Sequence, residues 1–334
     1  MNGPGINRLR GPILRSVSRS FYLSLRILPA PLRDPLSLAY LLARTTDTIA
    51  DTAGAPAELR VESLRNLAVA IQGNAPITTA PDIRASFGPF QSDAAERALI
   101  DALPETLEWL ERLDDRDRPE VRDVLQKINR GQMLDLERFG AGEGIRALPT
   151  AAALDEYTYL VAGCVGEFWT RICFAHVRDF SERTEAEMLE LGVKYGKGLQ
   201  LINVLRDAGS DLREGRCYLP SEELHSLGLS PEEILANPGR IDAVIRRWRE
   251  KAESAMAAGV DYACAIRSRR VRFATALPAL IGARTLALLR EAGAGIFVRQ
   301  VKVPRVEVRK LMSSIATRLA SPKSLRETFR RLSQ

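Results

Sequence analysis

The chain has 334 residues, of which 46% are hydrophobic and 27% are charged, as is usual for globular proteins. The net charge of +6 is uneven, because residues 265–334 hold 16 Lys and Arg against 3 Asp and Glu. Such a basic region can contact an anionic membrane or form a solvated helix face. It lacks the interleaved aromatic residues and motifs of nucleic-acid binders, so we expect no nucleic-acid partner.

The first residues predict a flexible N-terminus over 1–15, because the segment opens with a glycine-rich stretch. Arg8, Arg10 and Arg15 leave no continuous apolar core for a signal peptide. The four cysteines show no C-x-x-C spacing, which favours a reducing compartment. We therefore expect a cytoplasmic protein, in contact at most with the inner face of a membrane.

The ordered part of the chain opens with Ser18, Arg19 and Ser20. Their hydroxyl and guanidinium groups are of the kind that bind phosphate oxygens. A helix cap followed by a surface arginine is the alternative for these three residues taken alone.

The first acidic motif is Arg44-Thr-Thr-Asp47-Thr-Ile-Ala-Asp51, which follows an apolar run at 36–42. The run predicts a helix from about residue 36. On a helix Asp47 and Asp51 lie one turn apart, so their side chains share a face.

The middle of the chain reads as further helices at 58–72, 95–112 and 121–139, with a long loop at 73–94. Residues 151–177 are apolar on nearly all sides, as in a helix buried inside a bundle. Gly163 and Gly166 leave one side of this helix bare, which permits close helix packing or gives room for a ligand.

The central acidic motif lies on a predicted helix, where Asn203, Asp207 and Asp211 follow at intervals of four. Gly215 is a predicted helix stop. Like charges one turn apart repel, whereas oxygen ligands at this spacing suit Mg²⁺. The alternative is a solvated acidic face, with arginines 206, 213 and 216 as salt-bridge partners.

Two copies of the D-x-x-x-D pattern are more specific than either alone. If the two helices face each other, four carboxylates can hold Mg²⁺ ions, and these ions can hold diphosphates. The remaining apolar segments, at 231–235, 242–262, 273–289 and 306–319, also have helical spacing, and only 297–303 alternates like a strand. The sequence therefore predicts a single all-α domain.

The chain resembles the squalene/phytoene synthases, the head-to-head trans-prenyltransferases. The resemblance rests on Ser18-Arg-Ser-Phe21, the first acidic motif, Tyr157-Thr-Tyr-Leu-Val-Ala-Gly-Cys-Val-Gly166, and the segment from Gln200 to Asp211 with Gly215-Arg-Cys-Tyr-Leu-Pro220. It implies an isoprenoid synthase-type helical bundle with a central apolar cavity, over residues 16–312, followed by a basic amphipathic tail at 313–334.

The resemblance also implies roles for individual residues. The metal ligands would be Asp47, Asp51, Asn203, Asp207 and Asp211, with the four aspartates and Tyr157, a motif tyrosine that assists proton removal, as catalytic residues. Diphosphate would be held by Ser18, Arg19, Ser20, Arg44, Arg206 and Arg216. The cavity would be lined by Phe21, Tyr40, Val161, Gly163, Gln200, Phe273 and Pro278.

The C-terminal third is similar to squalene synthases, at 273–278 and at 301–312. A bacterial-type enzyme is expected, because no hydrophobic C-terminal anchor follows. Two departures from the family pattern are Ala50, where squalene synthases often have Glu, and Ala39, where an aromatic residue is common.

The implied reaction joins two farnesyl diphosphates through presqualene diphosphate to squalene, with Mg²⁺ and NADPH as cofactors. The cofactor phosphates would meet Lys302, Arg305, Arg309 and Lys310, for which a solvated basic face is the alternative. Presqualene diphosphate, dehydrosqualene and phytoene synthases stay open as alternatives on the same fold. A non-catalytic helical assembly factor is a further alternative.

Overall fold

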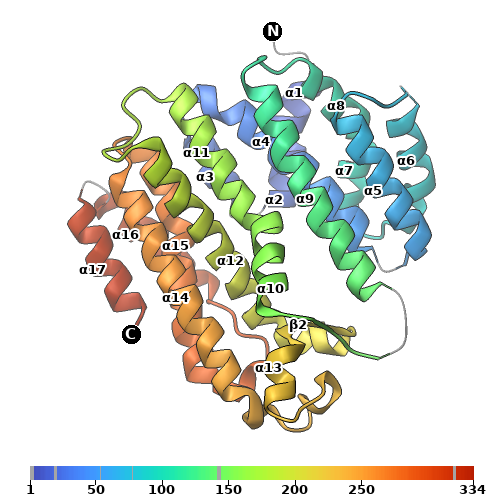
Figure 1. Ribbon diagram of the computed structural model, residues 1–334. Coiled ribbons are helices and arrows are strands. Elements are labelled where there is room, and N and C mark those ends of the chain that lie inside the picture. Colours follow the sequence, from blue (N-terminus) through green and yellow to red (C-terminus); the bar gives the residue numbers. More distant parts are fainter. Residues whose placement is uncertain (1–3, 19–20, 53, 77, 141–143, 319–320) are drawn as a thin grey trace. The chain divides into compact units, whose positions relative to one another are not determined.

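The computed structural model describes residues 4–18, 21–52, 54–76, 78–140, 144–318 and 321–334. Internal contacts divide the chain into two compact units, Met1–Ala141 and Gly142–Gln334, whose elements are labelled in Figure 1. Each unit is described by itself below. The predicted limits of the domain and of the tail, at residues 16 and 312, stay predictions.

Unit 1 is helical wherever its described residues form regular structure. Its elements are α1 (Pro4–Arg8), η1 (Leu9–Ile13), α2 (Leu14–Ser18), α3 (Phe21–Ile27), α4 (Ala30–Asp51), α5 (Ala57–Ile71), α6 (Thr79–Phe87), η2 (Gly88–Phe90), α7 (Ala94–Asp101), α8 (Leu103–Glu111) and α9 (Asp117–Phe139).

Helix α4 is the central element of unit 1 and packs along α9. The helix begins at Ala30 rather than near residue 36. Pro31 lies in its first turn, where a missing N–H is tolerated, and Pro35 lies inside the helix without ending it. Leu38, Leu42 and Ile49 are fully buried and fix the helix in the unit. The first acidic motif therefore sits on the last two turns of a well-anchored helix.

Two predictions for unit 1 are wrong. Residues 4–15 are helical, and Leu9 and Ile13 are buried, so this part of the segment expected to be flexible is packed. The expected loop at 73–94 contains α6, whose Ile83 and Phe87 are buried. In both places glycine and proline residues suggested a turn or loop, although apolar residues occur there at helical spacing. Glycine and proline end a helix only where packing does not offset their unfavourable helix propensity.

Unit 2 contains the remaining elements. They are β1 (Arg146–Leu148), α10 (Ala151–Thr158), η3 (Tyr159–Gly163), α11 (Cys164–His176), α12 (Glu185–Arg213), β2 (Arg216–Pro220), α13 (Ser221–Ser226), η4 (Pro231–Glu233), η5 (Pro238–Ile241), α14 (Asp242–Ala265), α15 (Arg269–Ala292), η6 (Gly293–Phe297), α16 (Arg305–Arg318) and α17 (Pro322–Leu332).

Helix α12, which carries the central acidic motif, is defined at both ends. At its start the Thr184 hydroxyl and the Glu187 carboxylate form a capping box. At its end Gly215 adopts φ +82°, a conformation that glycine takes without strain, so the predicted helix stop is confirmed. The chain then turns directly into β2.

Glycines bring α12 against the η3–α11 helix. A Cβ on Gly166 would lie 2.0 Å from the Gly192 carbonyl oxygen, and one on Gly196 would lie 2.2 Å from the Ala162 carbonyl oxygen. The backbones of the two helices are therefore in contact. Of the two interpretations of the bare side of this helix, close packing holds at Gly166.

The two short strands pair in parallel, with Arg146 opposite Arg216 and Ala147 opposite Cys217. Residues 297–303, whose alternation resembles that of a strand, do not form one. Helix η6 ends at Phe297, and the chain then runs irregularly to α16. The small sheet connects the segment that precedes α10 to the segment that follows α12.

Helix α15 is long and apolar enough to cross a membrane by length and composition, yet 78% of its most apolar window is buried inside the protein. It packs on α14 and on α12, as a core helix does. The C-terminal helix α17 in turn packs on α14 and α15 and buries Leu325.

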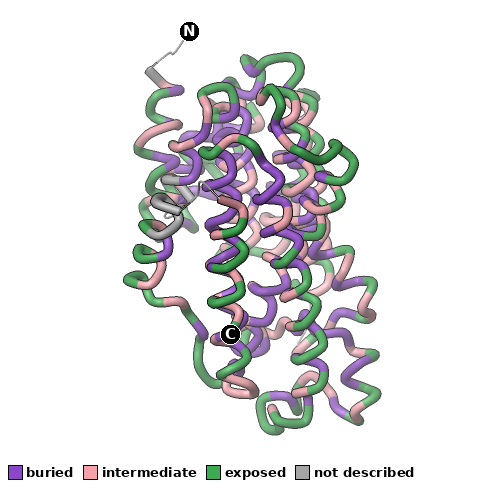
Figure 2. Tube along the Cα trace, turned by 90° about the vertical axis from the view of Figure 1, so that its left-hand side faces the viewer, coloured by how far each residue is buried: buried purple, intermediate pink, exposed green. Residues whose placement is uncertain are grey.

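The helices of the described chain bury one side and expose the other, which Figure 2 shows as purple and green positions alternating along the trace. The predicted all-α class is confirmed. All four cysteines are buried and unpaired with one another.

Substituting Gly166 by alanine should destabilise the protein. The new methyl group would meet the Gly192 carbonyl, and such overpacking costs roughly 1–3 kcal/mol. We expect the Tm from circular dichroism to fall by several degrees. The matched variant Gly239→Ala places its methyl where no atom lies within 4 Å, so its Tm should be unchanged. Equal Tm values for the two variants would contradict the close packing.

Candidate active site

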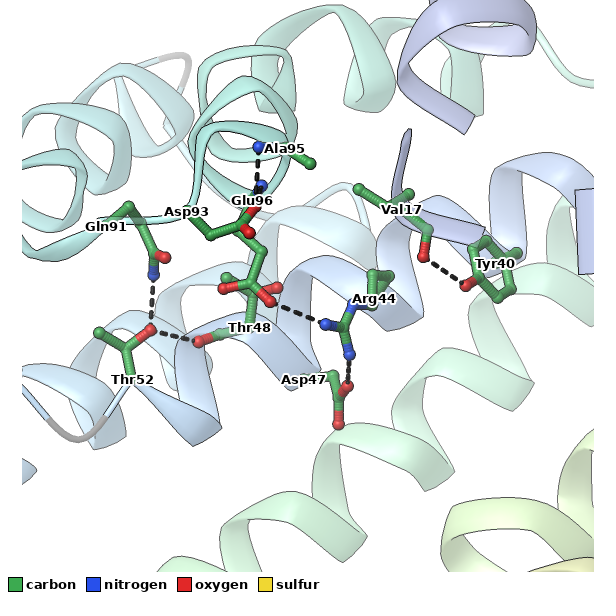
Figure 3. Close-up of polar contacts among 10 residues, drawn as sticks. All are labelled: Val17, Tyr40, Arg44, Asp47, Thr48, Thr52, Gln91, Asp93, Ala95 and Glu96. Atoms are coloured by element: carbon green, nitrogen blue, oxygen red, sulfur yellow. Dashed lines mark hydrogen bonds and ion pairs between the residues drawn. The ribbon is translucent and has the colours of Figure 1, made fainter. Parts of the chain in front are cut away.

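The candidate residues of unit 1 gather at the end of α4 (Figure 3). The Arg44 guanidinium makes ion pairs with the carboxylates of Asp47, on the next turn, and of Glu96, on α7, the latter at 2.7 Å. Asp51 is the last residue of the helix and is exposed. Arginine and carboxylates thus form one cluster here. Sequence reasoning missed Glu96, because nothing in the local sequence connects α7 with α4.

The Asp47 carboxylate is electrostatically unfavourable in its ionised form. Desolvation by burial and the charge of Asp51 raise its pKa, while the Arg44 guanidinium lowers it. Water still reaches 42% of the side chain, so a cation can approach. A cation bound here would relieve the repulsion between the two carboxylates.

The other predicted residues of unit 1 lie on the helices before this cluster. The Tyr40 hydroxyl donates to the Val17 carbonyl at 3.1 Å, as Figure 3 shows. The Ser18 hydroxyl is buried and donates to the Leu14 carbonyl one turn back. Arg19, Ser20 and the side chain of Phe21 lie outside the described residues, so their predicted roles stay predictions.

The candidate residues of unit 2 gather at the end of α12. Arg206 forms a two-pronged ion pair with Asp207, in which its Nε lies 2.9 Å from Oδ1. Arg216, on β2, reaches back to Asp211 at 3.2 Å and to Glu214 at 2.6 Å. The turn at Gly215 makes this return possible, because it reverses the chain directly after the helix.

Asp211 is also unfavourable as an anion. Desolvation by burial raises its pKa to about 6, and Asp207 adds to this, against the Arg216 guanidinium, which lowers it. Only 15% of the side chain is exposed. Both acidic motifs therefore hold a carboxylate whose charge needs more compensation than the protein's own arginines supply.

A chain of hydrogen bonds links the acidic row of α12 to Tyr157. The Asn203 amide donates to the Gln200 side-chain oxygen at 3.2 Å, and the Gln200 amide donates to the Tyr157 hydroxyl at 3.4 Å. Tyr157, at the end of α10, is buried. The structure thus brings together three of the predicted residues on one side of α12.

Tyr218 on β2 stacks on Tyr157, with ring centroids 4.9 Å apart and the planes inclined by 26°. Tyr218 lies within the motif at 215–220, but the sequence alone indicated no role for it. The signal was its position two residues after Arg216, since side chains alternate along a strand and positions 216 and 218 share a face.

The predicted cavity residues of unit 2 lie on η3, α12 and α15. Val161 and Gly163 belong to the π-helical turn η3, a type of turn that often marks functional sites. Gly163 faces the stem of Lys197. Gln200 is on α12, Phe273 is buried on α15, and Pro278 lies inside α15 without ending it. The central cavity itself stays a prediction.

A hollow of about 510 Å³ lies in unit 2 among α10, η3, α11, α12 and α14. Its lining includes Tyr159, Lys194, Lys197 and Lys251 but none of the predicted cavity residues. Lys197 is already paired with Asp155 at 2.6 Å. This hollow is therefore distinct from the predicted cavity.

The donor set of the acidic motifs fits a divalent cation held jointly with diphosphate. Within the described part of each unit, no group of three or more His, Cys, Asp or Glu residues could hold a metal alone. Mg²⁺ is commonly bound through one or two carboxylates together with substrate phosphates. The buried Nε of Arg44, which has no hydrogen-bond partner in the described chain, is a further donor for an anion.

The predicted cofactor-binding residues lie at the surface of unit 2. Lys302 is in the irregular segment before α16, while Arg305, Arg309 and Lys310 are on α16. All four are exposed. Their role in binding a cofactor stays a prediction.

Residues 14–307 match the family model described as squalene/phytoene synthase. The chain belongs to the squalene/phytoene synthase family. Members of this family are prenyltransferases that bind prenyl diphosphates and use a divalent metal to ionise them. The family recognised in the sequence is therefore confirmed.

Several curated relatives match at similar identity. The chain is 29% identical to the presqualene diphosphate synthase of Rhodopseudomonas palustris, over 88% of this chain and 89% of the relative. It is 29% identical to the bifunctional lycopene cyclase/phytoene synthase of Phaeosphaeria nodorum over 72% of this chain, but spans only 39% of that protein.

Solved structures share the fold. A squalene synthase solved with the ligand E5700 superposes with a TM-score of 0.78 at 20% identity, covering 99% of this chain and 90% of the other. A dehydrosqualene synthase in complex with a ligand gives 0.64 at 21% identity, covering 94% and 97%. The isoprenoid synthase-type fold of this family member is thereby confirmed.

Replacing Asp211 by asparagine should stabilise the metal-free protein above pH 6. Because the pKa of Asp211 is raised in the folded state, protonation of this carboxyl stabilises the fold. That contribution to the free energy of unfolding is complete below pH 3.8 and is lost as the pH rises through about 6. Asparagine is neutral at every pH in this range, so the variant avoids the cost of a buried charge above pH 6. We expect the Tm in EDTA to exceed the wild-type Tm at pH 7.5 by about 2–5 °C and to equal it near pH 4.

The control is Asp123→Asn, which alters an exposed carboxylate paired with Lys127 and should leave the Tm nearly unchanged. Mg²⁺ with inorganic diphosphate should raise the Tm of the wild type more than that of Asp211→Asn. A lower Tm for Asp211→Asn in EDTA at pH 7.5 would show that the Arg216 ion pair outweighs burial.

Proposed function

We propose that this enzyme joins two molecules of farnesyl diphosphate head to head into presqualene diphosphate. One observation carries the proposal: a presqualene diphosphate synthase matches this chain along almost the whole length of both proteins. A second relative of that name, from Zymomonas mobilis, is 29% identical over 82% of this chain and 80% of the relative. The two acidic motifs, with their arginines, support diphosphate chemistry.

The carboxylates of Asp47, Asp51, Asp207 and Asp211, with the Asn203 amide, would hold Mg²⁺ together with the diphosphates. When bound there, Mg²⁺ would supply charge neutralisation to the leaving diphosphate. Arg44 and Arg216 already lie within these clusters and can turn from their carboxylate partners to phosphate oxygens as the charge moves. The carbon–oxygen bond of one substrate breaks, and the double bond of the second substrate attacks the allylic cation.

A proton must leave when the cyclopropane ring closes. The Tyr157 oxygen is the acceptor we propose, because it is buried and is held by the Gln200 amide and by the Tyr218 ring. As the phenol oxygen takes this proton, its own hydroxyl proton would pass to an oxygen of the released diphosphate, so that the phenol stays neutral. Direct proton transfer to the released diphosphate is the alternative. Apolar helices such as α15 would exclude water, which would otherwise convert the cation into an alcohol.

Reduction of presqualene diphosphate to squalene is the second candidate function. It is favoured by the similarity of 273–278 and 301–312 to squalene synthases. NADPH supplies hydride in such a step. Lys302, Arg305, Arg309 and Lys310 are exposed and could bind its phosphates, but the chain has no glycine-rich dinucleotide turn beside them. Dehydrosqualene and phytoene are the other products that the family makes possible.

The decisive test is incubation of the purified protein with farnesyl diphosphate and Mg²⁺, with and without NADPH, read by mass spectrometry. Presqualene diphosphate in both reactions is expected for the first step alone, and squalene only with NADPH for both steps. EDTA should abolish turnover. Phytoene from geranylgeranyl diphosphate, with farnesyl diphosphate untouched, would overturn the substrate assignment.

Asp207→Asn should lower kcat by about 10²–10³-fold, since it removes charge that acts on the leaving group. Asp123→Asn, on the exposed side of α9, should retain wild-type turnover. Wild-type kcat in Asp207→Asn would contradict the proposed metal role of this carboxylate.

Tyr157→Phe should lower kcat by about 10²-fold or more while keeping the Tm, because the ring still stacks on Tyr218. The matched control is Tyr159→Phe. The hydroxyl that it removes donates to Glu167, and both residues line the 510 Å³ hollow of unit 2. Unchanged kcat in Tyr157→Phe would assign proton removal to the released diphosphate.

A further inference from the structure

The segment 298–310, which leads from η6 into the first turns of α16, is a basic surface of unit 2. Its five basic residues are all exposed, namely Arg299, Lys302, Arg305, Arg309 and Lys310. Its single acidic residue, Glu307, is already paired with Arg284 at 2.8 Å. The segment therefore presents positive charge with no acidic neighbour of its own sequence to balance it.

Two valines project from the same segment into solvent. Val298 is 78% exposed and Val306 is 61% exposed, more than any other large hydrophobic residue in the described chain. On α16, Arg309 and Lys310 follow Val306 by three and four positions, so they share its face. Exposed apolar side chains close in sequence to exposed cations are typical of a surface that enters the headgroup region of a membrane.

The exposure of these valines is fixed by the core. Val301 and Leu311, within and just after the segment, are buried and hold it on the unit, and α16 packs on α15. Because the inward positions are taken by Val301 and Leu311, the segment cannot bury Val298 and Val306 without giving up these contacts. The outward valines are thus a stable feature of the fold.

The C-terminal helix α17 does not offer an equivalent surface. Its apolar side packs on α14 and α15, and Leu325 and Thr328 are buried there. The basic amphipathic tail predicted from the sequence has therefore already used its apolar face inside the protein.

We propose that residues 298–310 dock on an anionic membrane, with the basic side chains on headgroup phosphates and both valines inserted below them. The positive charge of the surface selects anionic lipid over neutral lipid. A nucleotide or a nucleic acid would use the same charges but would gain nothing from the valines. The proposal is independent of the reaction assigned above.

The test is co-sedimentation of the full chain with vesicles of phosphatidylcholine alone or mixed with equal parts of phosphatidylglycerol. Binding to the mixed vesicles should be at least about tenfold tighter than to the neutral ones and should weaken as salt rises. No binding to the mixed vesicles, or equal binding to both, would overturn the proposal.

The decisive variant is Val298→Ser combined with Val306→Ser, which leaves every basic residue in place. It should weaken vesicle binding by about tenfold while turnover of detergent-dispersed prenyl diphosphate stays at the wild-type level. The matched control is Val69→Ser, on α5 of unit 1, which is 46% exposed and should bind like the wild type. Unchanged binding by the double variant would show that the valines do not insert.

Insertion can be observed directly with an environment-sensitive dye on Val298→Cys. The four native cysteines are buried, so the label goes to the new thiol. We expect its emission to shift to the blue on addition of the mixed vesicles. An unshifted label on bound protein, or displacement of the protein from vesicles by NADPH, would reassign the surface to a nucleotide.

Discussion

The contact between α12 and the η3–α11 helix is the constraint on which the rest of unit 2 depends. Gly166 and Gly192 allow the two backbones to touch. At this separation the Gln200 amide can reach the Tyr157 hydroxyl at 3.4 Å, near the upper limit of a hydrogen bond. A small increase in the spacing would therefore disconnect Tyr157 from the acidic row, although neither helix would need to unfold.

The second constraint is the energetic cost of ionising a desolvated carboxylate, and both acidic motifs reduce this cost in the same way. A carboxylate that is expensive to ionise is placed beside an arginine, Asp47 with Arg44 and Asp211 with Arg216. The arginine compensates only part of the cost, since the pKa of each carboxyl stays raised. Such residual strain is typical of sites that complete their charge balance with a ligand.

The catalytic groups explain the family but not the product. Enzymes of one fold make presqualene diphosphate, squalene, dehydrosqualene or phytoene, and relatives with several of these names match this chain at about the same identity. In the proposed mechanism, carboxylates and arginines act on the diphosphate, which all these substrates share. The same mechanism leaves the product to the apolar walls and to access of a reductant, where a few side chains would change the outcome.

The sequence by itself determined the helical class, the two acidic motifs and the family, because helical spacing and the intervals between Asp residues are local properties of the chain. It also located Tyr157, Gln200 and Asn203, although not the hydrogen bonds between them.

Only the tertiary structure decided the rest. Glu96 reaches Arg44 from α7, and Tyr218 stacks on Tyr157 from β2, so each contact joins segments far apart in the sequence. The burial of the N-terminal helices and the outward position of Val298 and Val306 were decided in the same way. Burial depends on which neighbours cover a side chain, and that is a property of the packed chain rather than of any local pattern.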